Sequence, residues 1–213
     1  MKARLPSLRS LRKKSQDVAG FVLAGGRSSR MGADKALLEL SGFPLITWAL
    51  LMLKGAGLEV WIAGARNPEL ASFAPLIADA WEDAGPLGGV CSALRQTQRD
   101  WAVFVTVDQP LMAPALLIGL LDRARAGQQG VTLASIGGVA QTFPAVVQRA
   151  ALAVLEGKVE KGQLGCMAAF RAAGLQVVAA EDLVVPESRS LIDRWFSNVN
   201  TPEDLERVRQ QLG

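Results

Sequence analysis

Histidine is absent from the 213 residues of this chain. The absence excludes a serine–histidine–aspartate triad, an imidazole general base and most zinc enzymes, because each of these depends on histidine side chains. The chemistry of this protein must therefore rely on carboxylates, lysine, arginine and a hard metal ion.

Long apolar runs and cysteines are also scarce. No stretch approaches the ~18 apolar residues that a membrane-spanning helix requires, so we expect no membrane partner. The two cysteines, Cys91 and Cys166, stand far apart and lack the spacing of metal ligands. We interpret them as reduced, buried thiols of a cytoplasmic protein.

Basic residues are concentrated at the N-terminus, although the formal net charge is only +3. The first fourteen residues contain no acid and six cations, namely Lys2, Arg4, Arg9, Arg12, Lys13 and Lys14. The basic character thus belongs to a tail and not to a face that binds nucleic acid. The tail lacks the apolar core of a signal peptide, and we interpret it as a frayed terminus, with weak binding to RNA or an anionic membrane as the alternative. We expect a flexible tail over residues 1–16 and a single domain over residues 17–213, with half of all residues hydrophobic and available for a core.

The most informative segment runs from Leu23 to Lys35 and reads Leu-Ala-Gly-Gly-Arg-Ser-Ser-Arg-Met-Gly-Ala-Asp-Lys. An apolar run ends at Ala24 and is followed by Gly25 and Gly26. Because glycine has no Cβ, a ligand can approach the backbone closely at these two positions. Consecutive N–H groups that point one way form a concavity for an anion. The segment also holds three cations, Arg27, Arg30 and Lys35. This combination is typical of a polyphosphate site.

Two common phosphate motifs do not fit this segment. It is not a Walker A loop, because Lys35 neither directly follows a glycine nor precedes Ser or Thr. It is not a dinucleotide fingerprint, because five other residues separate Gly26 from Gly32. The alternative is a surface loop with scattered charge, and for Arg27 alone we prefer that interpretation. Asp34 is expected either to orient Lys35 or to start the next helix.

Apolar runs alternate with helical patterns along the rest of the chain, which predicts an α/β fold with a mainly parallel sheet covered on both faces. Expected strands are 18–24, 58–63, 76–78, 101–107, 131–134, 143–147 and 175–179. Expected helices are 44–54, 87–96, 114–126, 149–156 and 166–173, followed by a last helix that Thr201 caps, with Pro202 and Asp204 in its first turn. Ligands of such sheets bind beyond the carboxyl ends of the strands.

Two aspartates follow predicted strands at that edge. Asp108 ends the buried run Trp101–Val107, where an unpaired carboxylate would cost stability and a hard cation such as Mg²⁺ would compensate it. Asp79 follows the short third strand, and its carboxylate could accept hydrogen bonds from a ribose or a base edge. An ordinary turn aspartate is the alternative for each. Gly85-Pro86-Leu87-Gly88-Gly89 is expected either at an anion-binding helix start or in a tight turn.

The segment from Leu23 to Lys35 resembles the signature of the molybdenum cofactor guanylyltransferases, Leu-Ala-Gly-Gly-x-Ser-x-Arg-Met-Gly-x-Asp-Lys. Three downstream motifs extend the resemblance from about Ala19 to the C-terminus: Gly85-Pro86-Leu87-Gly88-Gly89, Asp108-Gln109-Pro110 and Asn198-Val199-Asn200-Thr201-Pro202. The resemblance implies a single-domain three-layer α/β/α nucleotidyltransferase fold with a Rossmann-like sheet. It also implies transfer of GMP from GTP to molybdenum-bound molybdopterin, with release of pyrophosphate and dependence on Mg²⁺.

The resemblance also implies roles for individual residues. Asp108 would hold Mg²⁺ against the nucleotide phosphates, Arg30 would contact the phosphates and Asp79 the guanosine. The implied nucleotide site comprises Leu23, Ala24, Gly25, Gly26, Lys35, Asp79 and Asp108. Gln141, Asn198 and Asn200 would lie on the acceptor side, where local capping before Thr201 is the alternative for the two asparagines. Transient contact with molybdoenzymes or other cofactor-biosynthesis proteins follows from such a function.

Two departures from the family pattern leave the substrates open. Ala63 stands where the family often has an asparagine that touches the nucleotide, and residues 161–166 contain less arginine than usual on the acceptor side. A related transferase for CTP or a sugar phosphate is therefore one alternative, against which Gly26 argues, since cytidylyl relatives usually have Ala-Ala-Gly. A non-catalytic chaperone that binds nucleotide or cofactor is another, against which Asp108, Lys35 and Arg30 together argue.

Overall fold

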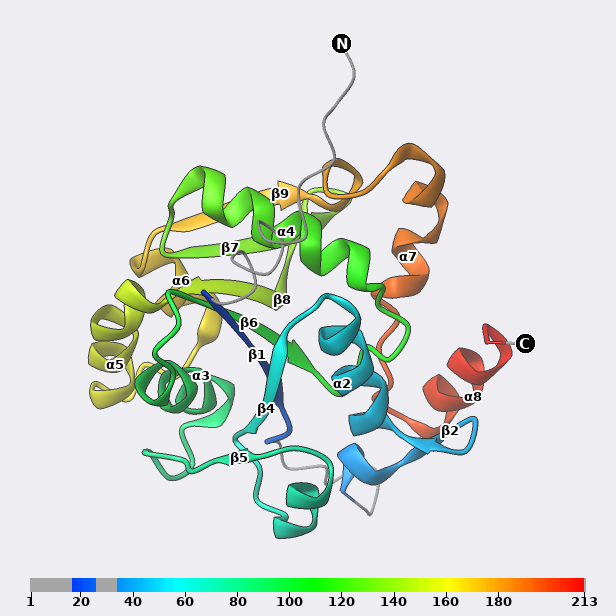
Figure 1. Cartoon of the computed structure of the whole chain (residues 1–213), viewed down its shortest axis with the longest axis horizontal. Helices are drawn as coiled ribbons and strands as arrows, with labels where there is room; N and C mark the ends of the chain where they lie inside the picture. The colour runs from blue at the N-terminus through cyan, green and yellow to red at the C-terminus, as the bar shows by residue number, and fades with distance from the viewer. Residues whose placement is uncertain (1–16, 26–33, 213) are drawn as a thin grey trace.

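A computed structural model describes residues 17–25 and 34–212 of the chain (Figure 1). Seven strands form one sheet in the order β5-β4-β1-β6-β8-β7-β9, and β2 and β3 form a separate small hairpin. The strands are β1 Val18–Leu23, β2 Glu39–Leu40, β3 Phe43–Pro44, β4 Glu59–Ala63, β5 Leu76–Ile77, β6 Trp101–Thr106, β7 Val131–Ile136, β8 Val139–Gln148 and β9 Leu175–Ala179. The helices are α2 Leu45–Gly55, α3 Gly85–Gln96, α4 Pro114–Gly127, α5 Leu152–Glu160, α6 Cys166–Ala172, α7 Ile192–Trp195 and α8 Pro202–Gln210.

The sheet is parallel except at β8, which runs antiparallel to both β6 and β7. Strands β1 and β6 lie at its centre, and every residue of β1 is buried. Their continuous apolar sequences suit strands that are covered on both faces. The expected mainly parallel sheet with helices on both faces is thus confirmed.

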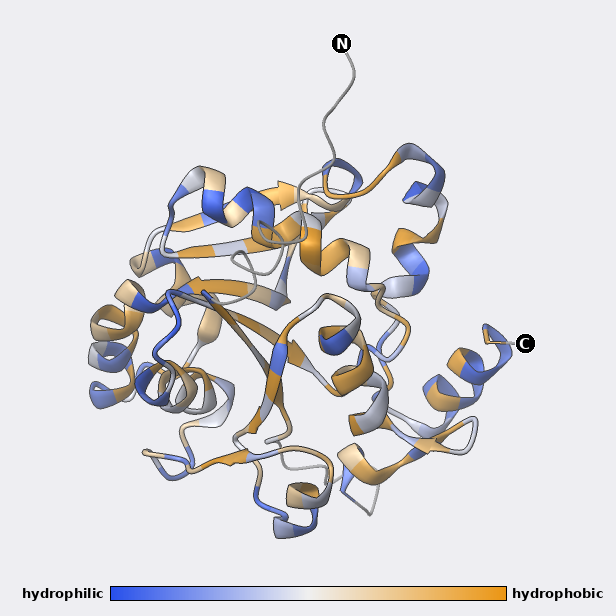
Figure 2. Ribbon diagram, viewed as in Figure 1, coloured by the Kyte–Doolittle hydropathy of each residue, from blue (hydrophilic) through white to orange (hydrophobic). Residues whose placement is uncertain are grey.

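Two apolar cores lie on opposite faces of this sheet. Alternate residues of β1 divide between them: Val18 and Val22 belong to one core and Phe21 and Leu23 to the other, as the two-residue period of a strand requires. Buried residues of α2, α4, α7 and α8 contribute to the first core, and those of α3, α5 and α6 to the second. Figure 2 shows the hydrophobic colouring along the strands and polar colouring on the outer turns of the helices. The result is a three-layer α/β/α arrangement.

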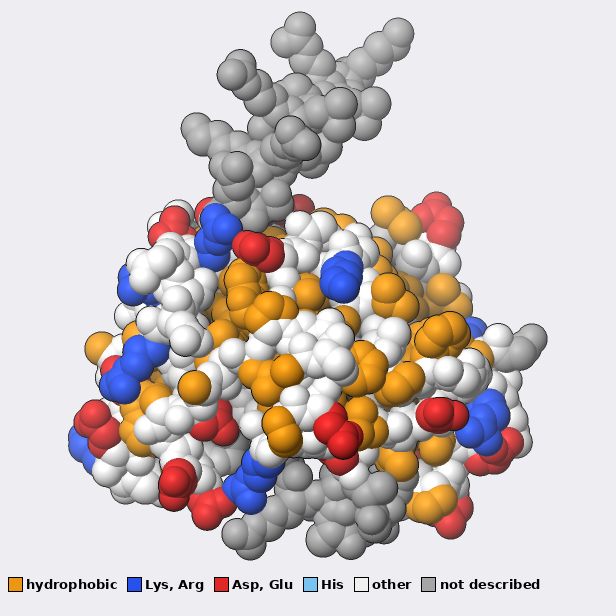
Figure 3. Space-filling view, turned by 60° about the horizontal axis from the view of Figure 1, so that its bottom comes forward, with side chains coloured by type: hydrophobic (Ala, Val, Ile, Leu, Met, Phe, Trp, Pro, Cys, Tyr) orange, Lys and Arg blue, Asp and Glu red, His pale blue; other side chains and the backbone are white. Residues whose placement is uncertain are grey.

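The surface mixes both signs of charge. On the face drawn in Figure 3, basic and acidic side chains are interspersed around a central area where hydrophobic side chains are exposed. Within the described ranges, no helix is long and apolar enough to span a membrane.

Candidate active site

The glycine end of β1 and the acid end of β6 lie side by side. Parallel pairing matches Leu23 with Thr106, so Gly25 and Asp108 both lie two residues beyond the last matched pair. On its other side, β1 pairs with β4, and the N–H of Ala24 donates to the carbonyl of Ala63 at 3.0 Å. The carboxyl ends of β4, β1 and β6 thus bring three segments together at one edge, where an α/β sheet binds its ligands.

Gly25 fits this edge only because it lacks a side chain. A Cβ at this position would lie 2.3 Å from the carbonyl oxygen of Gly64, in the loop after β4. Gly64 itself has a φ of +69°, in the left-handed region that favours glycine. Sequence reasoning missed this contact, because it joins two loops that are far apart in the chain. The close approach of the backbones at Gly25 and Gly64 therefore determines the shape of this part of the site.

Gly25→Ala is expected to destabilise the fold by about 1–3 kcal/mol, because the methyl group would force two backbone segments apart. Thermal and urea unfolding measure this loss. Gly157→Ala is the matched control, since nothing lies within 4 Å of a Cβ at that position in α5. There alanine should leave stability unchanged or raise it. Equal stability of Gly25→Ala and the wild type would contradict the close approach.

Lys35 reaches the acid end of β6 from a different part of the chain. Asp34 caps the short 3₁₀ helix Lys35–Leu37 by accepting a hydrogen bond from the N–H of Ala36 at 3.0 Å. The Lys35 ammonium lies 3.4 Å from Oδ2 of Asp108 and donates to Oδ1 of Asn200 at 2.8 Å. Of the two roles expected for Asp34, the structure shows the helix start. The lysine thus stands between a carboxylate and an amide at the sheet edge.

Asp108 is held at both its side chain and its backbone. The hydroxyl of Thr106 donates to its Oδ1, and its carbonyl oxygen accepts from the N–H of Val199 at 2.8 Å. Its side chain is 27% exposed and hence open to a ligand. Sequence reasoning missed Thr106, although a hydroxyl at the end of a predicted strand and two residues before an acid was a usable signal.

The residues present fit a magnesium ion whose ligands come partly from the protein and partly from a bound substrate. Within residues 17–25 and 34–212, no three His, Cys, Asp or Glu side chains gather as a closed metal cage. Mg²⁺ usually takes one or two carboxylates and completes its shell with water and phosphate oxygens. A partly exposed Asp108 beside Lys35 is suited to that arrangement.

Asp79 follows β5 on the far side of the Gly64 loop. Partial burial raises the pKa of its carboxyl above the ordinary value, while the N–H of Gly64 and the charge of Arg66 oppose the shift. Arg66 also forms an ion pair with Asp83. Ala63, at the end of β4, is fully buried in the second core. The backbone of Gly64 and the carboxyl group of Asp79 are thus the candidate ligand-binding groups of the loops that follow β4 and β5.

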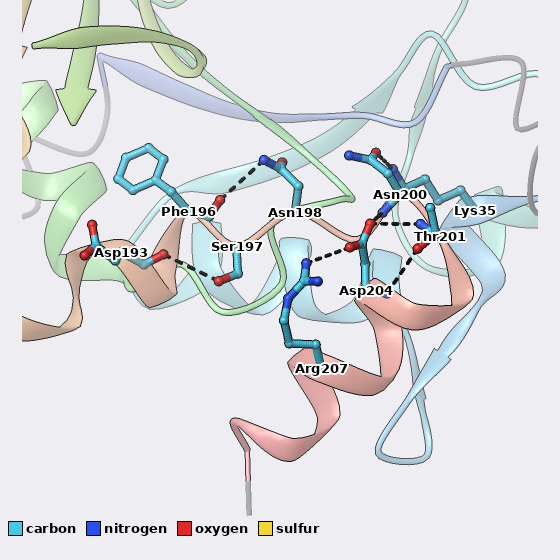
Figure 4. Close-up of polar contacts among 9 residues, drawn as sticks. All are labelled: Lys35, Asp193, Phe196, Ser197, Asn198, Asn200, Thr201, Asp204 and Arg207. Atoms are coloured by element: carbon cyan, nitrogen blue, oxygen red, sulfur yellow. Dashed lines mark hydrogen bonds and ion pairs between the residues drawn. The ribbon is translucent and has the colours of Figure 1, made fainter. Parts of the chain in front are cut away.

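The segment Asn198–Thr201, which precedes α8, lies beside Lys35 (Figure 4). Val199 is fully buried, whereas the flanking asparagines are exposed, as expected for extended backbone. Asn200 meets Lys35, while Nδ2 of Asn198 donates to the carbonyl of Phe196 at 3.4 Å. The structure therefore brings Asn200 to the lysine and holds Asn198 by a local contact.

Gln141 lies in β8, which pairs with β6 in a register that matches Phe104 with Ala145. That pairing ends at Ala145, so the register between β8 and β6 does not extend to Gln141. Its side chain donates to the carbonyl of Val139 at 3.1 Å. Gly26, Arg27 and Arg30 lie outside the described residues, so the structure gives no position for them.

The cysteines lie in α3 and α6 as free thiols, of which Cys91 is buried as predicted and Cys166 is only partly buried. Burial raises the pKa of Cys91 to about 12 and that of Cys166 to about 11. At neutral pH both are therefore protonated and poor nucleophiles. We expect iodoacetamide at pH 8 to alkylate the folded protein roughly tenfold or more slowly than the urea-unfolded chain. Mass spectrometry of each cysteine measures this rate, and equal rates in the two states would contradict the burial.

Comparisons with known proteins show the family of this chain. Residues 20–182 match the sequence model of the MobA-like NTP transferase domain. The molybdenum cofactor guanylyltransferase of Vibrio atlanticus is 30% identical over 86% of this chain and 91% of its own length. That of Pseudomonas putida KT2440 is 34% identical over 87% of this chain and 94% of its own length.

Solved structures give the same fold. Molybdopterin-guanine dinucleotide biosynthesis protein A from Archaeoglobus fulgidus superposes with a TM-score of 0.77 at 22% identity, covering 91% of this chain and 98% of its own. A CMP:2-keto-3-deoxy-manno-octonic acid synthetase with CTP bound superposes with a TM-score of 0.67 at 17% identity, covering 92% and 98%. On the strength of the sequence matches, this chain belongs to the MobA-like nucleotidyltransferases, in the family of the molybdenum cofactor guanylyltransferases.

Proposed function

We propose that this protein transfers GMP from GTP to the terminal phosphate of molybdenum-bound molybdopterin, with Mg²⁺ as cofactor. The products are the guanine dinucleotide form of the cofactor and pyrophosphate. The protein would receive or deliver the cofactor through transient contact with molybdoenzymes or other cofactor-biosynthesis proteins. The free thiols of Cys91 and Cys166 fit the reducing conditions of the cytoplasm.

One observation carries the proposal, namely the position of the Lys35 ammonium. It lies between Asp108 and Asn200 at the carboxyl end of β6, beside the glycine end of β1. A cation at this edge supports binding of a polyphosphate, and the nearby carboxylate of Asp108 could hold a divalent metal ion that neutralises phosphate charge. Pure nucleotide binding does not require that acid, so this combination favours a transferase.

The reaction joins two phosphates and expels a third group. A terminal phosphate oxygen of the acceptor attacks the α-phosphorus of GTP, and the bond from the α-phosphorus to the oxygen that bridges to the β-phosphorus breaks. Its electron pair leaves with pyrophosphate. The acceptor is a phosphate monoester dianion, so no base has to remove a proton. This is consistent with a chain that contains no histidine.

The chain's own groups supply position and charge. Lys35 and Arg30 would neutralise charge that grows on the leaving pyrophosphate and on the equatorial oxygens. Backbone N–H groups from Gly25 and Gly26 would cradle the phosphates, and Leu23 and Ala24 would lead into that cradle. Asp108 would hold the Mg²⁺ ion, which supplies further charge neutralisation when bound. Asp79 would face the guanosine, and Gln141, Asn198 and Asn200 the acceptor.

A turnover assay tests the proposal. The protein is incubated with molybdopterin, Mg²⁺ and each nucleoside triphosphate in turn, and pyrophosphate release is measured. Release with GTP alone is the expected result. Release with CTP alone would select a cytidylyltransferase, and no release with any nucleotide would favour a non-catalytic binder.

A further inference from the structure

The last helix, α8, begins with a reciprocal pair of hydrogen bonds. The N–H of Asp204 donates to the Thr201 hydroxyl at 3.2 Å, and the N–H of Thr201 donates to Oδ2 of Asp204 at 3.0 Å (Figure 4). This is a capping box, which satisfies N–H groups that a helix leaves without partners in its first turn. Stability of α8 alone accounts for these two bonds.

Asp204 makes two more contacts that a capping box does not need. Its Oδ2 also accepts from the N–H of Asn200 at 2.8 Å, and Nη2 of Arg207 donates to its Oδ1 at 2.6 Å. The additional N–H belongs to the residue before the cap, and the side chain of that residue meets Lys35. A direct chain of contacts thus runs from Asp204 through Asn200 to the lysine at the active site.

The stretch around Asn200 is fixed at several points. Val199 is fully buried, and its N–H donates to the carbonyl of Asp108 at 2.8 Å. Asn200 is held at its N–H by Asp204, and its side-chain oxygen accepts from Lys35 at 2.8 Å. An exposed amide on an extended segment would otherwise sample several rotamers and backbone positions. Its geometry toward Lys35 therefore depends on what holds its backbone.

We propose that Asp204 is a positioning residue for the active-site lysine, acting by holding the backbone of Asn200 so that the amide oxygen of Asn200 orients Lys35. The proposal rests on the transferase function proposed above, because it assigns Lys35 to the nucleotide phosphates. The contacts of Asp204 are with Asn200, Thr201 and Arg207, so it acts on the lysine through Asn200. Small displacements of a group that contacts the reacting phosphates lower rates strongly, so loss of this restraint should be visible in catalysis.

The ionisation of Asp204 suits this role. The N–H of Asn200, followed by the Arg207 side chain, lowers the pKa of its carboxyl below the ordinary value. The carboxylate is therefore charged at neutral pH, and charged acceptors form the stronger hydrogen bonds.

The test compares Asp204→Ala with Thr201→Val. Each variant removes one half of the capping box, but only the first loses the bond to the N–H of Asn200. Valine suits position 201, where the backbone is extended at φ −133° and ψ 164°. We expect kcat/KM for GTP, measured at a temperature where both variants are fully folded, to fall on the order of tenfold or more in Asp204→Ala and less than about twofold in Thr201→Val. Asp204→Glu keeps a carboxylate that can reach back and should restore most of the activity.

A second readout does not depend on turnover. NMR of ¹³Cε-labelled lysine, assigned with Lys35→Arg, reports the surroundings of Lys35 without nucleotide. We expect the Lys35 signal to shift in Asp204→Ala and to stay in place in Thr201→Val. An unmoved signal in Asp204→Ala, or equal effects of the two variants on signal and activity, would overturn the proposal. Should Asp204→Ala fail to fold, Asp204→Asn takes its place, with a smaller shift expected. A wild type that is inactive with every nucleotide refutes the proposed function, whereas the Lys35 signal still decides the positioning.

Discussion

We expect Asp108→Ala to lower the turnover rate roughly 10²–10³-fold or more, while the fold stays intact. The magnitude is that of removing one preorganised group that stabilises transition-state charge. The proposed magnesium ion would lose its protein carboxylate, and Lys35 would lose the acid that lies 3.4 Å from its ammonium. Pyrophosphate release at saturating GTP and Mg²⁺ measures the effect, and circular dichroism checks the fold.

Asp100→Ala provides the matched control for this variant. Asp100 is an exposed aspartate that directly precedes β6, whereas Asp108 follows the same strand at its other end. We expect Asp100→Ala to retain wild-type turnover. Full activity of Asp108→Ala would remove the metal assignment, and equal losses in both variants would indicate damage to β6 and not to the site.

Lys35→Ala should weaken binding of GTP by about 1–3 kcal/mol, the usual scale for a lost hydrogen bond to a charged group. This corresponds to a rise in Kd of roughly fivefold to 150-fold, measured by calorimetry in the presence of Mg²⁺. The reason is the position of the ammonium beside Asp108 and the glycine end of β1. Lys54→Ala, which removes an exposed lysine from α2, should leave the Kd unchanged.

Lys35→Arg separates charge from shape at the same position. Arginine keeps the positive charge but replaces a compact ammonium with a wide planar fork. Because Lys35 fits between Asp108 and Asn200, we expect Lys35→Arg to restore affinity only in part. Unchanged GTP binding in Lys35→Ala would contradict the phosphate role of this lysine.

The sequence predicted the central elements well because they are long and strongly patterned. The apolar runs of β1 and β6, the proline start of α4 and the Thr201 cap lie where the residues predicted them, whereas α3 begins at Gly85 and not at Leu87. The hairpin β2–β3 was not predicted, because each of its strands has only two residues. Its turn residues, Ser41 and Gly42, have φ values of +51° and +83°. Short elements carry too little periodicity to predict.

The candidate site was predicted as a set of residues but not as a set of contacts. Gly25 and Asp108 could be placed at one edge, since both follow strands of a parallel sheet. The meeting of Gly25 with Gly64, and of Lys35 with Asn200, depends on how loops from distant strands pack. No local pattern encodes such a contact, and Asp204, which supports Asn200 from the next helix, gave only the signal of a helix cap.

The contact between Lys35 and Asn200 joins positions 165 residues apart. Residues 20–182 match the transferase sequence model, yet the partner of the lysine comes later in the chain. A fragment cut at the boundary of that model would keep Lys35 and Asp108 but lose the amide that accepts from the lysine, so the geometry of this cation depends on a segment outside the matched domain.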